Sequence, residues 1–158
     1  MIINKCVEQG IYVVSILALE KDHRPLRSVE LSAILCVSDS YLKKIFRKLV
    51  LAKIIDSNAG KEGGFQLSRP IEDISVYDVY SALEGEICEF KTSGIQSRIF
   101  IDDEKFMKSE EKVSLAFEDA NKAFADVLRN LKFSDLVDEN NRKNGIIKFE
   151  ELVKNARH

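Results

Sequence analysis

A run of basic residues between Ser38 and Leu49 has the composition and spacing of a helix that binds nucleic acid. At 3.6 residues per turn, its apolar side chains fall on one face and its polar side chains on the other. The apolar stripe consists of Leu42, Ile45, Phe46 and Leu49. Ser40, Lys44 and Arg47 lie near the centre of the polar face, flanked by Lys43 and Lys48. Because like charges four residues apart repel, this face is expected to meet an anion, although a solvated basic face explains the same pattern.

The polar side chains differ in what they can contact on DNA. Arg47 can form a bidentate pair with guanine, whereas Ser40 and Tyr41 can bond a phosphate or a base edge. Lys43 and Lys48 are expected to contact phosphates.

Ser38 is the predicted N-cap of this helix, where its hydroxyl satisfies an otherwise unpaired backbone amide. Ser38 is also the last of the candidate DNA-binding residues on the helix. Just upstream, Ser28–Cys36 is predicted as a short helix with Ser28 as its cap. Two or three residues then separate the two helices. This spacing is that of a helix-turn-helix.

Two short strands are predicted downstream, at Ala52–Ser57 and Gly64–Ser68, and the loop between them is rich in residues that tolerate positive φ. This hairpin is expected to be the wing of a winged helix-turn-helix, lying on the DNA backbone or minor groove while the basic helix enters the major groove. Lys61 at its tip can follow the backbone. Gly60, Gly63 and Gly64 permit a close approach to it.

The second half of the chain contains the pattern of a helix that packs against another helix. Ser75 and Asp78 have the spacing of a capping box, before a helix that should end at Gly85 and link the wing to the dimerisation arm. A longer helix is predicted from about Glu104 to Asn130. Its apolar residues are spaced four and three apart in alternation, as in a coiled-coil seam. The seam consists of Val113, Phe117, Ala120, Phe124, Val127 and Leu131. Such a seam packs against either the rest of its own domain or the same helix of a second copy.

The remainder is predicted as a short helix over Lys132–Val137 capped by Ser134, a loop over Glu139–Gly145 and a short helix over Ile146–Ala156. The predicted domains are a winged helix-turn-helix over 1–85, a linker or sensor segment over 86–103, a dimerisation helix with its return over 104–137, and a tail over 138–158. The fold class is therefore mainly α with a small β-hairpin wing.

The two halves of the chain differ in net charge. Residues 1–70 carry 11 Lys and Arg against 7 Asp and Glu, whereas residues 71–158 carry 13 against 19. A basic half suggests that one end meets nucleic acid. No apolar run spans a bilayer and no signal peptide is evident, and three widely spaced cysteines suit a reducing cytoplasm. No phosphate loop, metal-ligand spacing or convincing nucleophile–base pair indicates an enzyme.

Over roughly residues 1–137 the sequence resembles the Rrf2 family of bacterial transcription regulators. The resemblance rests on Ser-x-Ser-Tyr-Leu-x-x-Ile-Phe-x-Lys-Leu from Ser38, Gly-Gly-Phe-x-Leu-x-Arg-Pro from Gly63, Ile-Ser-Val-x-Asp-Val from Ile74 and Leu-Glu-Gly from Leu83. It implies a homodimer that binds a palindromic operator, usually as a repressor.

The sequence differs from the family pattern at positions that matter for the signal the regulator would sense. Relatives with an iron–sulfur cluster place three cysteines just after the Leu-Glu-Gly motif, but residues 86–103 contain only Cys88, so no cofactor is expected. Cys88 is a candidate sensor; the alternatives are an ordinary cysteine, a small-molecule effector or a regulatory protein partner. Cluster-containing relatives often carry Glu where this chain has Lys43, so the same operator is not implied. The alternative function is a winged-helix module that binds a protein rather than DNA.

Overall fold

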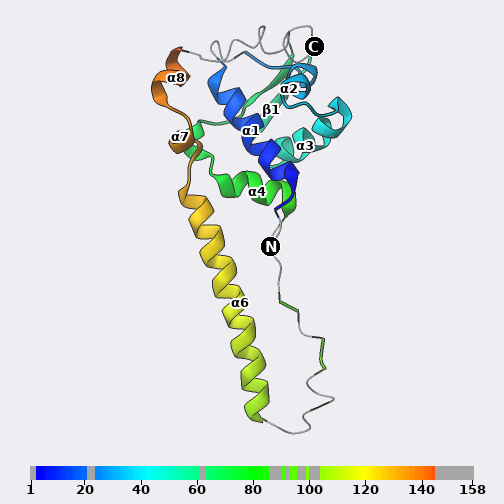
Figure 1. The fold of residues 1–158 in the computed structure, drawn as a ribbon, viewed down its shortest axis with the longest axis vertical. Helices are drawn as coiled ribbons and strands as arrows, with labels where there is room; N and C mark the ends of the chain where they lie inside the picture. The colour runs from blue at the N-terminus through cyan, green and yellow to red at the C-terminus, as the bar shows by residue number, and fades with distance from the viewer. Residues whose placement is uncertain are drawn as a thin grey trace.

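The computed structural model describes residues 3–20, 24–60, 63–85, 90–91, 93–95, 99 and 104–144. The first helix, α1 (Lys5–Leu19), lies at the centre of the domain, where Val13, Val14 and Leu17 are buried. It packs against the helix-turn-helix, the hairpin and α4 (Val76–Glu84). Figure 1 shows these elements gathered at one end of the molecule, with the long α6 (Glu104–Asn130) leading away from them. The predicted fold class is confirmed.

The helix-turn-helix consists of α2 (Ser28–Ile34) and α3 (Asp39–Leu51). The predicted N-cap of α2 is off by one residue, because Glu30 accepts the backbone amide of Arg27 at 2.7 Å and Ser28 is already helical. The predicted end is late, because Cys36 has a φ of 52°, a left-handed conformation that a helix cannot continue. Four residues therefore separate the helices rather than two or three.

The wing is an antiparallel hairpin of β1 (Ile55–Asn58) and β2 (Gly64–Leu67), with Ile55 opposite Leu67 and Asn58 opposite Gly64. The first strand begins later than predicted, because Ala52 is the C-cap of α3 and Lys53 has a φ of 53°. On its other side β2 is joined by Leu26, whose amide donates to Phe65 O at 2.9 Å and whose carbonyl accepts from Phe65 N at 2.8 Å.

A short 3-10 helix, η1 (Ile71–Asp73), leads from the wing into α4. The predicted capping box is confirmed: Asp78 Oδ2 accepts from Ser75 N at 2.7 Å, and Ser75 Oγ accepts from Asp78 N at 3.2 Å. The helix ends at Gly85, with a φ of 88°, as predicted.

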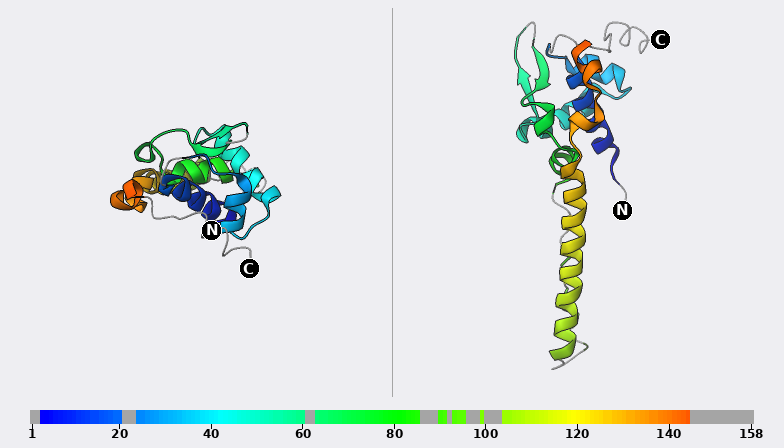
Figure 2. Two further views of the ribbon diagram at one scale, coloured as in Figure 1. Left: turned by 90° about the horizontal axis from the view of Figure 1, so that it is seen from above. Right: turned by 90° about the vertical axis from the view of Figure 1, so that its left-hand side faces the viewer.

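The long helix α6 has the predicted bounds and returns the chain to the domain (Figure 2). After it, Phe133 N donates to Ile74 O at 3.0 Å, and the Phe133 and Val137 side chains join the same core as α1. The return that we assigned to the arm therefore packs in the winged helix-turn-helix domain. In the described part of the chain, none of the helices is long and apolar enough to cross a membrane.

Two details of this return were predicted wrongly. In α7 (Phe133–Leu136) the N-cap is Lys132, whose amide donates to Asp135 Oδ2 at 2.9 Å, and Ser134 lies inside the helix. The predicted loop is mostly α8 (Glu139–Asn144), because Asp138 Oδ1 accepts from Asn140 N and Asn141 N and so begins a helix that has no apolar stripe. The helix predicted over 146–156 lies outside the described residues.

Candidate nucleic-acid interface

Helix α3 is fixed to the domain by its apolar stripe. All four residues of the stripe, Leu42, Ile45, Phe46 and Leu49, are buried as predicted. Ser38 caps the helix, with its hydroxyl accepting a hydrogen bond from Tyr41 N at 3.3 Å. Because one face is buried along the whole helix, the polar face must point to solvent.

Five side chains of the polar face are exposed, and Tyr41 at its border is partly buried. The exposed ones are Ser40, Lys43, Lys44, Arg47 and Lys48. Within the part of the chain that the structure describes, neither Lys44 nor Arg47 has an ion-pair or hydrogen-bond partner. Both side chains face solvent, and their contact with DNA stays a prediction.

Lys43 is not available in the same way. Its ammonium lies 2.7 Å from Asp39 Oδ2, one turn earlier on α3. The hydrogen bonds from Lys43, first, and from Ser28 lower the pKa of Asp39, so the carboxylate stays charged and offsets the lysine. Sequence reasoning missed this pair, although its i, i+4 spacing could have revealed it.

Lys48 also has a partner in the protein. Its Nζ donates to the carbonyl oxygen of Leu83, in the last turn of α4, at 2.5 Å. Nothing in the local sequence indicated this contact, because the two residues are 35 positions apart.

The wing is joined to α3 and is built around its glycines. The rings of Phe46 and Phe65 are in contact, with 4.1 Å between their centroids. A Cβ on Gly64 would lie 2.6 Å from Leu26 O, and one on Gly63 would overlap the backbone of Asn58. Both glycines are therefore required by the hairpin itself, and their close approach to DNA stays a prediction. Lys61 lies outside the described residues.

The predicted pairing seam lies along α6 and is mostly exposed in the single chain. Val127, Phe117 and Val113 are 68%, 49% and 44% exposed. Phe124 alone packs on the domain, with its ring centroid 5.2 Å from that of Tyr80 on α4. Leu131 and Ala120 are also exposed. Phe117 also stacks on Phe90 of its own chain, with 4.8 Å between the ring centroids. Val113, Ala120, Val127 and Leu131 are the seam side chains for which the described part of the chain shows no such ring contact, and they are exposed.

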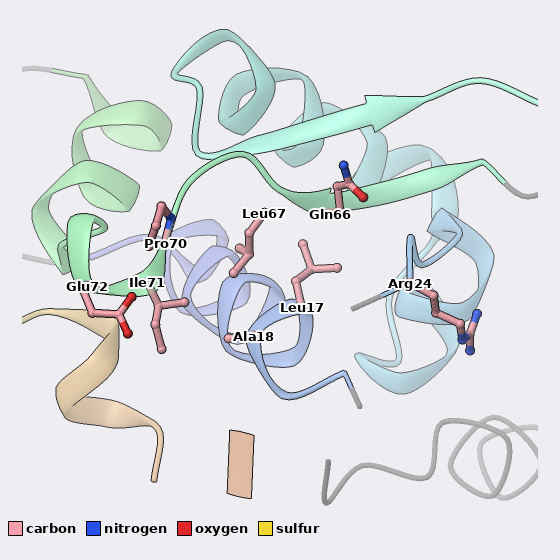
Figure 3. Close-up of a pocket in the computed structure, with 8 residues that line it drawn as sticks. All are labelled: Leu17, Ala18, Arg24, Gln66, Leu67, Pro70, Ile71 and Glu72. Atoms are coloured by element: carbon pink, nitrogen blue, oxygen red, sulfur yellow. The ribbon is translucent and has the colours of Figure 1, made fainter. Parts of the chain in front are cut away.

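A hollow of about 410 Å³ lies between the end of α1, β2 and η1 (Figure 3). Leu17, Ala18, Leu67 and Ile71 are among the side chains that line it, with Arg24 at one side and Glu72 at the other. Arg24 is already bound by Glu20 at 3.2 Å and Glu30 at 3.4 Å. The hollow therefore offers no uncommitted arginine to an anionic ligand.

The arrangement of α2, α3 and wing has counterparts in known proteins. The Rrf2 family model, described as an iron-dependent transcriptional regulator, matches residues 3–139. The chain belongs to the Rrf2 family. A protein of Lactococcus lactis subsp. lactis named as an HTH-type transcriptional regulator, YffB, is 36% identical over 132 residues, which are 84% of each chain. This Rrf2 protein is accordingly a transcription regulator and not an enzyme.

Solved structures share the fold of this Rrf2 protein. The structure of CymR, the global cysteine regulator of Bacillus subtilis, superposes with a TM-score of 0.63 at 20% identity, covering 86% of this chain and 95% of that one. The oxidised form of Staphylococcus aureus CymR gives a TM-score of 0.60 at 26% identity, covering 87% and 99%.

The described residues of this Rrf2 chain offer no donor set that matches the iron dependence in the family description. A cluster needs several thiolates in one place. The Cys6 thiol donates to Glu84 Oε1 at 3.4 Å, and burial, together with that hydrogen bond, raises the pKa of Cys6 and so disfavours the thiolate. Cys36 lies at the helix-turn-helix bend with its thiol on Ala33 O. Among the described residues, no three His, Cys, Asp or Glu side chains converge. Cys88, the candidate sensor, lies outside them.

Proposed function

We propose that this Rrf2 protein is a homodimeric repressor whose two α3 helices read a palindromic DNA operator without an iron–sulfur cluster. The observation that carries the proposal is a pair of cations, Lys44 and Arg47, that have no partner among the described residues and lie on the exposed face of α3. The opposite face of that helix is fully buried. A rigid helix with such a face can enter the major groove.

The side chains of α3 have different roles in this proposal. Arg47 is assigned to a guanine edge, with Ser40 and Tyr41 on a neighbouring phosphate or base. Lys44 is assigned to a phosphate. Lys43 can contact a phosphate only when its 2.7 Å ion pair with Asp39 is broken. The wing supplies Lys61 to the backbone next to the groove.

The homodimer is supported by the exposed seam of α6. Val113 and Val127 leave apolar surface in water in the single chain. A matching helix from a second copy would bury that surface in the geometry that the heptad spacing requires. Two copies related by a two-fold axis would read two inverted half-sites, and the family resemblance supports repression.

Selection from a random pool of DNA duplexes tests this function. The full chain, purified and with its absorbance spectrum recorded, is expected to be colourless and to enrich an inverted repeat. Placed over a promoter, the repeat should reduce transcription of a reporter. The matched control is the Lys44→Ala, Arg47→Ala double variant, which should keep its fold and enrich no sequence. If the unmodified protein enriches none at low and physiological salt, the function is instead that of a protein-binding winged-helix module.

A further inference from the structure

Lys48 differs from the other exposed cations of α3 because it is bound to another helix of the domain. Its ammonium donates to Leu83 O at 2.5 Å. That carbonyl is in the last turn of α4, where main-chain oxygens have no partner within the helix and carry the negative end of the helix dipole. A lysine ammonium satisfies both the oxygen and the dipole.

The last turn of α4 is also attached to α1. Glu84, the next residue, accepts hydrogen bonds from Asn4 Nδ2 at 2.8 Å and from Cys6 Sγ at 3.4 Å. Three helices are therefore joined around the two final residues of α4. The helix then ends at Gly85.

Helix α4 is in turn connected to the arm. Its Tyr80 ring packs edge-on against Phe124 of α6, and Val76 N donates to Leu131 O at 3.0 Å. A single rigid element thus lies between the recognition helix and the helix that carries the pairing seam. Lys48 makes a polar contact that joins α3 to that element.

We infer that Lys48 is a positioning residue for DNA recognition rather than a phosphate contact. The buried stripe fixes α3 to the domain, and by joining α3 to the end of α4 Lys48 adds a polar contact that tunes the orientation of the recognition helix relative to the arm, and hence the separation of the two recognition helices in the dimer. A dimer with fixed recognition helices accepts one spacing between half-sites, whereas a looser attachment accepts several. This inference rests on the proposed function.

The test compares Lys48→Met with Lys44→Met in the full chain. Binding is measured by fluorescence anisotropy on the selected operator and on versions with the half-sites one base pair closer or farther apart. Lys48→Met is expected to weaken binding to the preferred spacing about fivefold and to reduce the preference among spacings, while leaving the slope of log affinity against log salt unchanged. Lys44→Met should keep the spacing preference and reduce the slope by about 0.9 for each phosphate that the variant no longer neutralises.

Two further variants act as controls. Lys122→Met removes the same charge from an exposed position of α6 away from the seam, and it should match the unmodified protein in both measurements. Lys48→Arg keeps a cationic donor and should restore the spacing preference. Thermal unfolding checks that each variant is folded; if Lys48→Met is not, Lys48→Gln, which is neutral and shorter, is measured in the same way.

Two results would overturn the inference. In one, loss of Lys48 reduces the salt slope as loss of Lys44 does and keeps the spacing preference, which would make Lys48 a phosphate contact. In the other, both measurements stay as in the unmodified protein. Absence of any operator for the unmodified chain would instead reject the proposed function, so the two failures are distinguishable.

Discussion

The rings of Phe46 and Phe65 lie 4.1 Å apart between centroids, with their planes inclined by 31°. Phe46 is buried in the stripe of α3, whereas Phe65 is the residue of β2 that also pairs with Leu26. One contact therefore joins α3 to the wing, and the two elements proposed to face DNA are held in a fixed relation to each other.

Loss of this contact should destabilise the domain. Phe46→Ala removes a fully buried ring and should lower the free energy of unfolding by about 3–5 kcal/mol. Phe65→Ala removes a half-buried partner and should lower it by about 1–2 kcal/mol. Urea unfolding measures both. The control is Val29→Ala, at an exposed position of α2, which should change the free energy of unfolding by less than about 0.5 kcal/mol. Equal effects of Phe65→Ala and Val29→Ala would contradict the role of the ring contact.

Arg47→Ala should reduce operator affinity by more than about 1 kcal/mol and relax the preference for guanine at one position of each half-site. The fold should be unaffected, because the side chain is exposed and has no partner in the described part of the chain. Anisotropy at matched salt, on the operator and on single-base variants of it, measures both effects. Lys44→Ala is the comparison, since it should weaken all sequences alike. Unchanged affinity of Arg47→Ala would remove this residue from the interface.

Val127→Asp should convert the proposed dimer into a monomer. The side chain is 68% exposed in the single chain, so the substitution should not disturb the domain, but in the seam it would bury two carboxylates against apolar neighbours. Analytical ultracentrifugation of the purified protein gives the answer. Lys122→Ala, on the same helix away from the seam, should leave the dimer intact. A Val127→Asp protein that still sediments as a dimer would place the pairing surface elsewhere.

Asp39→Asn should change both stability and DNA binding. The lowered pKa of Asp39 means that its ionised form contributes stability at pH values above the ordinary aspartate pKa of about 3.9, and that this contribution is lost as the pH falls through the lower folded-state value. The variant should therefore be less stable than the parent at pH 7, and the difference should be smaller at about pH 3, below the ordinary aspartate value.

The same substitution frees Lys43 and should strengthen binding to all DNA sequences at low salt. Denaturant unfolding at the two pH values and anisotropy with a random duplex measure the two effects. A stability difference that is the same at both pH values would show that the carboxylate charge is not its cause.

Local patterns were sufficient to predict most of the fold. The stripe of α3, its Ser38 cap, the Ser75–Asp78 box and the length of α6 all depend on residues within a few positions of one another. The helix α8 was missed because it has no apolar periodicity and begins only with a polar cap at Asp138. The candidate site was less predictable. Lys48 and Leu83 are 35 positions apart, and their hydrogen bond forms only when two distant helices pack together, so no periodic pattern in the sequence predicts it.

The pairing of Leu26 with Phe65 has a consequence for the solution behaviour of the protein. A bare two-stranded hairpin presents two open edges, each of which can recruit a strand from another molecule and start aggregation. Leu26 closes one of these edges at the middle of β2 through two main-chain hydrogen bonds. The other edge, on β1, is only four residues long and includes Asp56, Ser57 and Asn58, a polar composition that discourages strand addition. The hairpin can therefore extend from the protein without becoming a template for self-association.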